Sequence, residues 1–201
     1  MRHAAVRHEW SPGIFDLIHQ DFEQQRTHWG RYMLNFDSRV QTLRDADFTG
    51  DHVFVQPVGD TKYFTGKVLT RDEFMRWRDA ICAGDVEQGT GLSPDTLVQL
   101  NEPLSIHAEY RFWVVAGEIV TCSMYRRGGQ VHYAGDVDTR VSDFVKARIV
   151  EWMPHESFVI DACDTPNGIR IVEINTLNSS SFYAADVQRL VSALHAAYST
   201  G

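Results

Sequence analysis

The sequence lacks any apolar run long enough to cross a bilayer, and its first residues lack the apolar core of a secretory signal peptide. Both absences predict a cytoplasmic protein with no membrane partner. Strong positive charge is also missing, because the formal net charge is −8 at pH 7. This charge argues against general electrostatic binding to nucleic acid, so any phosphate-bearing partner must be held by a few placed residues.

Cysteine is scarce, and the three cysteines are Cys82, Cys122 and Cys163. Their odd number and their spacing argue against a disulfide framework and against a zinc knuckle. The nine histidines form no His-Glu-x-x-His motif, and no Gly-x-Ser-x-Gly motif is present. The sequence therefore gives no sign of zinc chemistry or of a catalytic nucleophile.

The composition that is present is that of a globular protein. Of 201 residues, 43% are hydrophobic and 23% are charged, which suffices for one full core or two small lobes. Apolar residues at helical spacing predict helices within residues 13–33, 139–152 and 184–198. Thr70 and Glu73 have the capping-box spacing, which predicts a further helix that ends near residue 84.

Strands are predicted where β-branched and aromatic residues gather, at residues 52–57, 63–69 and 96–100. From residue 109 to 125 the pattern predicts two strands joined by a short turn at residues 116–117. Antiparallel hairpins mixed with helices are typical of an α+β fold rather than of a doubly wound sheet.

Residues 158–175 are predicted to form one more hairpin. Two β-branched runs flank the sequence Asp-Thr-Pro-Asn-Gly, which favours turns. Side chains alternate between the faces of a strand, so Glu173 and Asn175 share a face. If residues 164–168 form a five-residue loop, Asp161 lies on that same face.

The length of this loop decides the prediction. The five-residue loop pairs Cys163 with Ile169, whereas a loop with an even number of residues would move Asp161 to the opposite face. With the odd loop, two carboxylates and one amide from residues 161, 173 and 175 meet in one place.

Asp161, Glu173 and Asn175 are therefore the predicted metal ligands. Mg²⁺ prefers oxygen ligands and is usually held by one or two carboxylates, while water and substrate phosphates fill the remaining positions. The alternative is that both carboxylates stand on the solvated face of an antiparallel hairpin.

Three motifs resemble one known family when they are taken in order. Residues 55–68, Val-Gln-Pro-Val-Gly-Asp-Thr-Lys-Tyr-Phe-Thr-Gly-Lys-Val, look like a first nucleotide-binding hairpin. Residues 109–117 look like a strand that follows an adenine-contacting hinge, and residues 171–175, Ile-Val-Glu-Ile-Asn, look like a Mg²⁺ strand. Together they resemble the ATP-grasp superfamily, in particular its branch of predicted amide ligases, over about residues 51–190.

The resemblance implies an ATP-grasp-like fold, with antiparallel sheets and packed helices in two small lobes. It divides the chain into an N-terminal, mostly helical segment at residues 1–50, a nucleotide-binding lobe at residues 51–108 and a C-terminal metal and nucleotide lobe at residues 109–201.

The resemblance also implies roles for single residues. Lys62 or Lys67 would contact the α- and β-phosphates of ATP, and Arg111 would approach the γ-phosphate or an acyl phosphate. Lys67 and Arg111 are thus the candidate catalytic residues, and Glu102 would hold the ribose. The predicted hinge, which would read adenine through backbone groups, consists of Gln99, Leu100 and Asn101.

These roles have plainer alternatives. Either lysine, taken singly, is explained as a solvated side chain. Arg111 could pair with Glu109 or stack on Trp113. The loop at residues 125–129, Tyr-Arg-Arg-Gly-Gly, is interpreted as a basic loop that captures a substrate carboxylate, with an exposed turn as the alternative.

Two departures from the family pattern matter. Relatives often carry a basic residue before the proline of the first hairpin, whereas this chain has Gln56, so one phosphate or substrate contact is expected to be absent. ATP-grasp enzymes also have an N-terminal α/β lobe, and only about fifty residues precede the hairpin here. We expect that lobe to be replaced, supplied by a partner subunit or lost.

The leading hypothesis is an ADP-forming, ATP- and Mg²⁺-dependent ligase. It would join a small-molecule or peptide carboxylate to an amine through an acyl phosphate, forming an amide or peptide bond. The alternatives are a non-catalytic or partner-dependent Mg-ATP-binding module, and an interaction domain with a solvated acidic hairpin. The identity of the substrates and the choice between a homo-oligomer and a partner subunit stay open.

Overall fold

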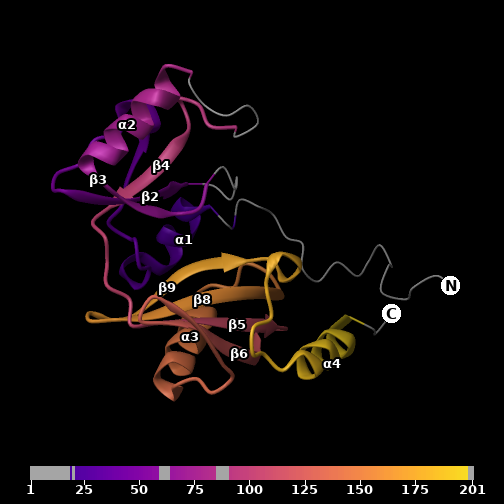
Figure 1. Ribbon diagram of the computed structural model, residues 1–201. Helices are drawn as coiled ribbons and strands as arrows, with labels where there is room; N and C mark the ends of the chain where they lie inside the picture. The colour runs from indigo at the N-terminus through magenta and orange to yellow at the C-terminus, as the bar shows by residue number, and fades with distance from the viewer. Residues whose placement is uncertain (1–18, 20, 59–63, 85–90, 199–201) are drawn as a thin grey trace. The chain divides into compact units, whose positions relative to one another are not determined.

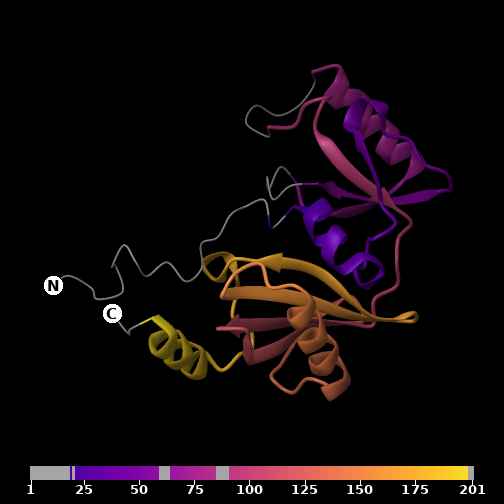
Figure 2. The same cartoon turned by 180° about the vertical axis from the view of Figure 1, so that it is seen from behind.

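The computed structural model describes residues 19, 21–58, 64–84 and 91–198, and within it the chain forms two compact units. The small unit comprises Asp21–Glu23 and Asn35–Leu104. The large unit includes Gln24–Leu34 and the chain from Ser105 onward. Figures 1 and 2 show the elements of each unit from two opposite sides.

The small unit is built on an antiparallel sheet with the strand order β1-β4-β2-β3. The helix α2 (Arg71–Cys82) packs against β2 and β3, and Figure 1 shows it lying across the sheet. Short 3-10 helices are η3 (Gly30–Tyr32), η4 (Leu43–Asp45) and η5 (Leu177–Ser179), of which η4 belongs to this unit. The strands are β1 (Arg39–Thr42), β2 (His52–Pro57), β3 (Lys67–Thr70) and β4 (Leu97–Asn101).

The start of α2 confirms the predicted capping box. The backbone N–H of Glu73 donates to Thr70 Oγ1 at 3.3 Å, and the backbone N–H of Thr70 donates to Glu73 Oε2 at 2.8 Å. Each residue satisfies a backbone donor that the first helical turn would otherwise leave unpaired. The helix thereby begins at a fixed point and places Phe74 over the sheet, where it is fully buried.

Apolar side chains from one face of the small sheet make the core beneath α2. Val53 and Val55 alternate on β2, and Val98 and Leu100 alternate on β4, and all four join Phe74 in one cluster. The residues between them on each strand must point to the other face. That alternation decides which predicted site residues face the core.

The large unit is built on a five-stranded antiparallel sheet with the order β7-β6-β5-β8-β9. The helix α3 (Thr139–Glu151) packs on β8 and β9, and α4 (Val187–Tyr198) packs on β5 and β6. The strands are β5 (Ala108–Val115), β6 (Glu118–Arg127), β7 (Gln130–Ala134), β8 (Ser157–Thr165) and β9 (Gly168–Asn175). Two antiparallel sheets with packed helices confirm the predicted α+β fold class.

The predicted turn at residues 116–117 is confirmed as the link between β5 and β6. Val115 pairs with Glu118, so Ala116 and Gly117 form a two-residue turn, and both have positive φ, at +51° and +79°. Positive φ at both central residues is the geometry that matches the twist of a hairpin.

Residues 1–50 were expected to be mostly helical, but their described part also contains a strand of the small sheet. In the described part, α1 (Phe22–Trp29) and η3 are helical, but β1 is a strand that pairs with β4. Strand pairing over such a separation along the chain leaves no local signal in the sequence. In the large unit, Trp29 Nε1 donates to the backbone oxygen of Arg148 at 3.0 Å, which ties the end of α1 to α3.

No helix in the described residues has the length and the hydropathy that are needed to span a membrane.

Candidate functional site

The hairpin of β8 and β9 has a shorter turn than the sequence predicts. Thr165 pairs with Gly168, so the turn holds two residues, and the predicted five-residue loop at 164–168 is wrong. Cys163 consequently pairs with Arg170 and not with Ile169. The tight turn is closed by Thr165 Oγ1, which donates to the backbone oxygen of Gly168 at 2.7 Å.

A β-bulge in β9 brings Asp161 and Glu173 back to the same face, although the two-residue turn alone would have placed them on opposite faces. Ala162 pairs with Ile171, but Asp161 pairs with Glu173, so Val172 is an extra residue on β9. One extra residue moves every later side chain of that strand to the other face. The even turn and the single bulge therefore cancel, and Asp161 lies directly opposite Glu173.

The bulge brings the predicted metal ligands to one face. Asn175 lies two residues beyond Glu173, and its Nδ2 donates to Glu173 Oε1 at 2.9 Å. Asp161 is 1% exposed, whereas the side chain of Glu173 is exposed. The described residues contain no group of three or more His, Cys, Asp and Glu side chains that could hold a metal ion. The candidate donor set is two carboxylates and one amide, which suits the oxygen chemistry of Mg²⁺.

Arg111 on β5 lies opposite Asp161 and holds both of its carboxylate oxygens. Nε donates to Oδ1 at 2.8 Å and Nη2 donates to Oδ2 at 2.7 Å, and both side chains are buried. Burial alone would lower the pKa of Arg111, but the hydrogen bonds and the charge of Asp161 outweigh it and raise that pKa. Arg111 thus pairs with Asp161 and not with Glu109 or Trp113, the predicted alternatives.

The Arg111–Asp161 pair lies on the face of the sheet that α4 partly covers. Trp113 and Val159 pack with Leu190 of α4, and they lie two residues from Arg111 and Asp161 on the same strands. Residues two apart on a strand share a face. The ion pair therefore lies next to the apolar patch under α4, in a polar region of the same sheet face.

Tyr125 and Glu109 complete this polar region, and the sequence analysis assigned them no such role. The hydroxyl of Tyr125 donates to Glu109 Oε2 at 3.0 Å and lies 3.5 Å from Asp161 Oδ2. Arg126 pairs with Glu109 Oε1 at 3.2 Å. Burial and then the charges of Asp161 and Glu109 raise the pKa of Tyr125, so its hydroxyl stays protonated as a donor.

A second missed residue is Tyr183, which follows η5. Its ring stacks on Tyr125 with centroids 5.0 Å apart, and Arg111 Cζ lies 5.2 Å from its ring centre. Its φ is +50°, a left-handed conformation that is uncommon for a bulky residue. No local sequence signal marks this conformation.

In the small unit the predicted hinge residues point in two directions. Leu100 pairs with Val55 and joins the core, whereas Gln99 and Asn101 point to the other face. Lys67 also pairs with Val55, so it lies on the side of Leu100. The structure therefore does not bring Lys67 to the face that holds Gln99 and Asn101.

Lys67 instead rests on aromatic rings. Its Nζ lies 4.0 Å from the ring centre of Trp77 and 5.4 Å from that of Phe64. Partial burial lowers the pKa of Lys67 below its ordinary value. Lys62 lies outside the described residues.

The face opposite the core carries carboxamides. Gln56 pairs with Gln99, which is 2% exposed and whose Oε1 has no hydrogen-bond partner among the described residues. Asn101 Nδ2 donates to Asn35 Oδ1 at 3.1 Å, while the buried Asn101 Oδ1 is also without a partner in the described structure. Buried acceptors of this kind suit a ligand that brings N–H donors.

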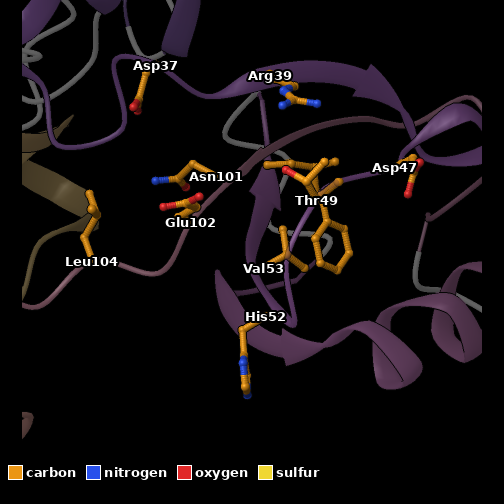
Figure 3. Close-up of a pocket in the computed structure, with 11 residues that line it drawn as sticks. Asp37, Arg39, Asp47, Thr49, His52, Val53, Asn101, Glu102 and Leu104 are labelled. Carbon is orange, nitrogen blue, oxygen red and sulfur yellow. The ribbon is translucent and has the colours of Figure 1, made fainter.

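A pocket of about 210 Å³ lies at the end of β4 in the small unit (Figure 3). It includes three predicted nucleotide contacts, Leu100, Asn101 and Glu102, and the figure shows the side chains of Asn101 and Glu102 on its border. The charges around it have both signs. The other lining residues are Asp37, Arg39, Asp47, Phe48, Thr49, His52, Val53 and Leu104.

The family model described as "ATP-grasp domain, R2K clade family 3" matches residues 3–194. The chain belongs to this ATP-grasp family. The resemblance inferred from the three motifs is thereby confirmed, and it extends beyond the predicted residues 51–190. A comparison with curated proteins found no match.

Solved structures show that this ATP-grasp chain shares its fold with several ligases. It is similar to the D-alanine–D-alanine ligase of Bacillus anthracis at 12% identity and a TM-score of 0.63, over 90% of this chain and 64% of that one. The RimK domain ATP-grasp protein of Sphaerobacter thermophilus gives 13% identity and 0.61, over 90% and 65%. The macrocyclase MdnC of Microcystis aeruginosa, bound with its precursor peptide MdnA, gives 12% and 0.58, over 92% and 61%. The ATP-grasp chain thus spans less than two thirds of each of these proteins.

Proposed function

We propose that this ATP-grasp protein is an ATP- and Mg²⁺-dependent ligase that joins a carboxylate to an amine. The observation that carries the proposal is the meeting of Arg111, Asp161, Glu173 and Asn175 on one sheet face. In a chain of this family, that face has the guanidinium and the oxygen donors that phosphoryl transfer to a carboxylate requires.

The chemistry assigns each group a task. A carboxylate is a poor electrophile, so its oxygen attacks the γ-phosphorus, ADP leaves, and an acyl phosphate results. The amine nitrogen then attacks the acyl carbon, phosphate leaves, and the amine loses a proton. Asp161 fixes the position of the Arg111 guanidinium, which would orient the anionic group through the N–H donors that this pair leaves open.

Asp161, Glu173 and Asn175 are the residues that would hold Mg²⁺, and their oxygens are of the kind this ion prefers. Mg²⁺ when bound would neutralise charge that develops on phosphate oxygens. Both oxygens of Asp161 already accept hydrogen bonds from Arg111, so its contribution to a metal site would come from the lone pairs that the guanidinium leaves open. The unpartnered Oε1 of Gln99 would suit the exocyclic amine of adenine.

The test is ADP release with a panel of carboxylates and amines. Glu173→Ala should abolish turnover, because it removes the exposed carboxylate of the donor set. Glu156→Ala, at the exposed end of the loop before β8, is the matched control and should keep full activity. Turnover that survives in Glu173→Ala would contradict the proposal.

A second candidate is a Mg-ATP-binding module without catalysis, favoured by one specific observation. Gln99 and the neighbouring Gln56 are neutral, while Lys67, the lysine of the first hairpin that the structure describes, lies on the core side over Trp77. Such a module would bind Mg-ATP and gain thermal stability, yet no acceptor would yield ADP. Differential scanning fluorimetry with Mg-ATP, read beside the ADP assay, separates the two candidates.

We further propose a cytoplasmic location and substrates that are small molecules or peptides. The similar structures, which include a D-alanine–D-alanine ligase and a macrocyclase bound with a precursor peptide, support both substrate sizes. Size-exclusion chromatography with light scattering would decide between a homo-oligomer and a partner-dependent subunit.

A further inference from the structure

Beside Arg111 the large unit carries three tyrosine rings in contact. Tyr125 and Tyr183 stack at 5.0 Å with an interplanar angle of 21°, and Tyr133 and Tyr183 meet at 5.2 Å and 33°. The ladder runs from Tyr125, which is partly buried, to Tyr133, which is 55% exposed. One end of the stack is thus exposed, and Tyr125 and Tyr183 adjoin the Arg111 guanidinium.

Tyr183 is held in the middle of this ladder by a braced segment, residues 182–186, which we call the strap. The backbone N–H of Ala184 donates to Ser123 Oγ at 3.1 Å, and the backbone N–H of Asp186 donates to Thr121 Oγ1 at 2.8 Å. Two hydroxyl groups of β6 thus fix the strap at two points that directly follow Tyr183. Ser123 is fully buried, which makes that anchor rigid.

The braced strap stabilises a costly conformation. A bulky residue at positive φ is strained by about 1–3 kcal/mol, and such strain persists only where the surroundings hold it. Tyr183 at +50° places its ring on Tyr125 and within 5.2 Å of Arg111 Cζ. The strained backbone therefore places the ring of Tyr183 beside the guanidinium of Arg111.

We propose that Tyr125, Tyr183 and Tyr133 form a subsite for a carboxylate substrate that carries an aromatic side group. This rests on the proposed function, in which Arg111 orients the anionic group as the substrate carboxylate becomes an acyl phosphate. Rings that are already nearly parallel favour a further ring by offset stacking, which an aliphatic group of equal size does not gain.

Charge complementarity supports a carboxylate as the occupant. Arg126 pairs across the strands with Glu109, so it shares the face of Arg111, and its side chain is 47% exposed. Arg111 and Arg126 are each paired with a carboxylate of the protein, and a substrate carboxylate would accept from the N–H donors that these pairs leave open.

The test uses two acids as probes, 3-phenylpropanoate and 3-cyclohexylpropanoate, in NMR titrations of the full-length protein without nucleotide. The two share a carboxylate and a chain length, and they differ in the aromatic ring. We expect the phenyl acid to bind about two- to tenfold more tightly. Equal affinities would overturn the proposal.

Variants locate the preference on the ladder. Tyr183→Ala should remove the difference between the two acids, and Tyr183→Phe should restore it, because the ring and not the hydroxyl stacks. Tyr133→Ala changes an exposed ring and keeps the test valid if Tyr183→Ala fails to fold. The control is Tyr32→Ala, which removes a tyrosine stacked on Arg148 elsewhere in the same unit at 3.7 Å. A preference that survives in both Tyr183→Ala and Tyr133→Ala would overturn the subsite.

The outcome is separable from that of the ligase proposal. If ADP is released equally with aliphatic and aromatic acids, the subsite proposal is overturned and the ligase proposal is not. If the phenyl acid binds selectively but Mg-ATP does not bind, the subsite proposal is supported and the ligase proposal is overturned.

Discussion

The two sheets of the molecule handle charge in opposite ways. On the large sheet, Arg111 and Asp161 form a buried, bidentate ion pair that fixes both groups. On the small sheet, the face opposite the core carries the neutral amides of Gln56 and Gln99, and Lys67 lies on the other side over a tryptophan. Among the described residues, the large sheet thus holds a fixed pair of charges, while this face of the small sheet offers neutral hydrogen-bonding groups.

The strongest test of this contrast is removal of the buried guanidinium. Arg111→Met should lower the free energy of unfolding by about 3–5 kcal/mol, because it leaves Asp161 buried without a counter-charge. Arg126→Met, which removes a half-exposed charge from the same face, should cost no more than about 1 kcal/mol. Urea denaturation measures both. If both variants lost similar amounts of unfolding free energy, the buried ion pair would contribute no more stability than a surface ion pair.

The small unit has little room for a side chain at Gly66. A Cβ at Gly66 would lie 2.6 Å from the ring of Phe54 and 3.0 Å from Gln56 Oε1. Gly66→Ala should therefore cost about 1–3 kcal/mol of stability, since those side chains must move. Thr65→Ala, at an exposed neighbour, should stay within about 0.5 kcal/mol. Thermal melts that coincide for the two variants would argue against this close approach.

A positive charge added to the small sheet should change its affinity for ATP. Gln56→Lys places an ammonium on the face that holds Gln99, where a charged hydrogen bond to phosphate would tighten ATP binding about tenfold. Isothermal titration calorimetry with Mg-ATP measures this, and Gln56→Met controls for the loss of the amide. An affinity unchanged by the lysine would show that the phosphates do not reach this face.

The last effect concerns Tyr125 and is absent at neutral pH. Its pKa is raised above the ordinary value of about 10 by burial and by nearby carboxylates, so the folded state keeps the proton that the unfolded state loses. Its stabilising effect is complete below pH 10 and is lost as the pH rises beyond it. Relative to Tyr125→Phe, the wild-type free energy of unfolding should fall by about 1.4 kcal/mol per pH unit above 10. Parallel pH profiles from urea titrations would refute this.

Local patterns were sufficient for much of the fold. The capping box at Thr70 and the two-residue turn at Ala116 depend on neighbouring residues, and both were predictable from composition and spacing. Family resemblance brought Arg111 and Glu173 together as site candidates. Their roles as nucleotide and metal contacts stay predictions.

What the sequence could not show depends on tertiary structure. The prediction for Asp161 assumed an odd loop, whereas the chain uses an even turn and compensates with a bulge at Val172. The inward direction of Lys67 follows from the register of β3, which no single segment encodes. Tyr183 adopts its conformation because the strap is hydrogen-bonded to β6, a strand about sixty residues earlier in the chain.

The surplus Val172 has a consequence for how this hairpin can change during evolution. A relative that gains or loses one residue in the turn at Pro166 would invert the orientation of its acidic pair unless it also lost or gained the bulge. In aligned relatives, a change of one residue in the turn should therefore be accompanied by a gain or loss of the bulge. The total number of turn and bulge residues should stay odd.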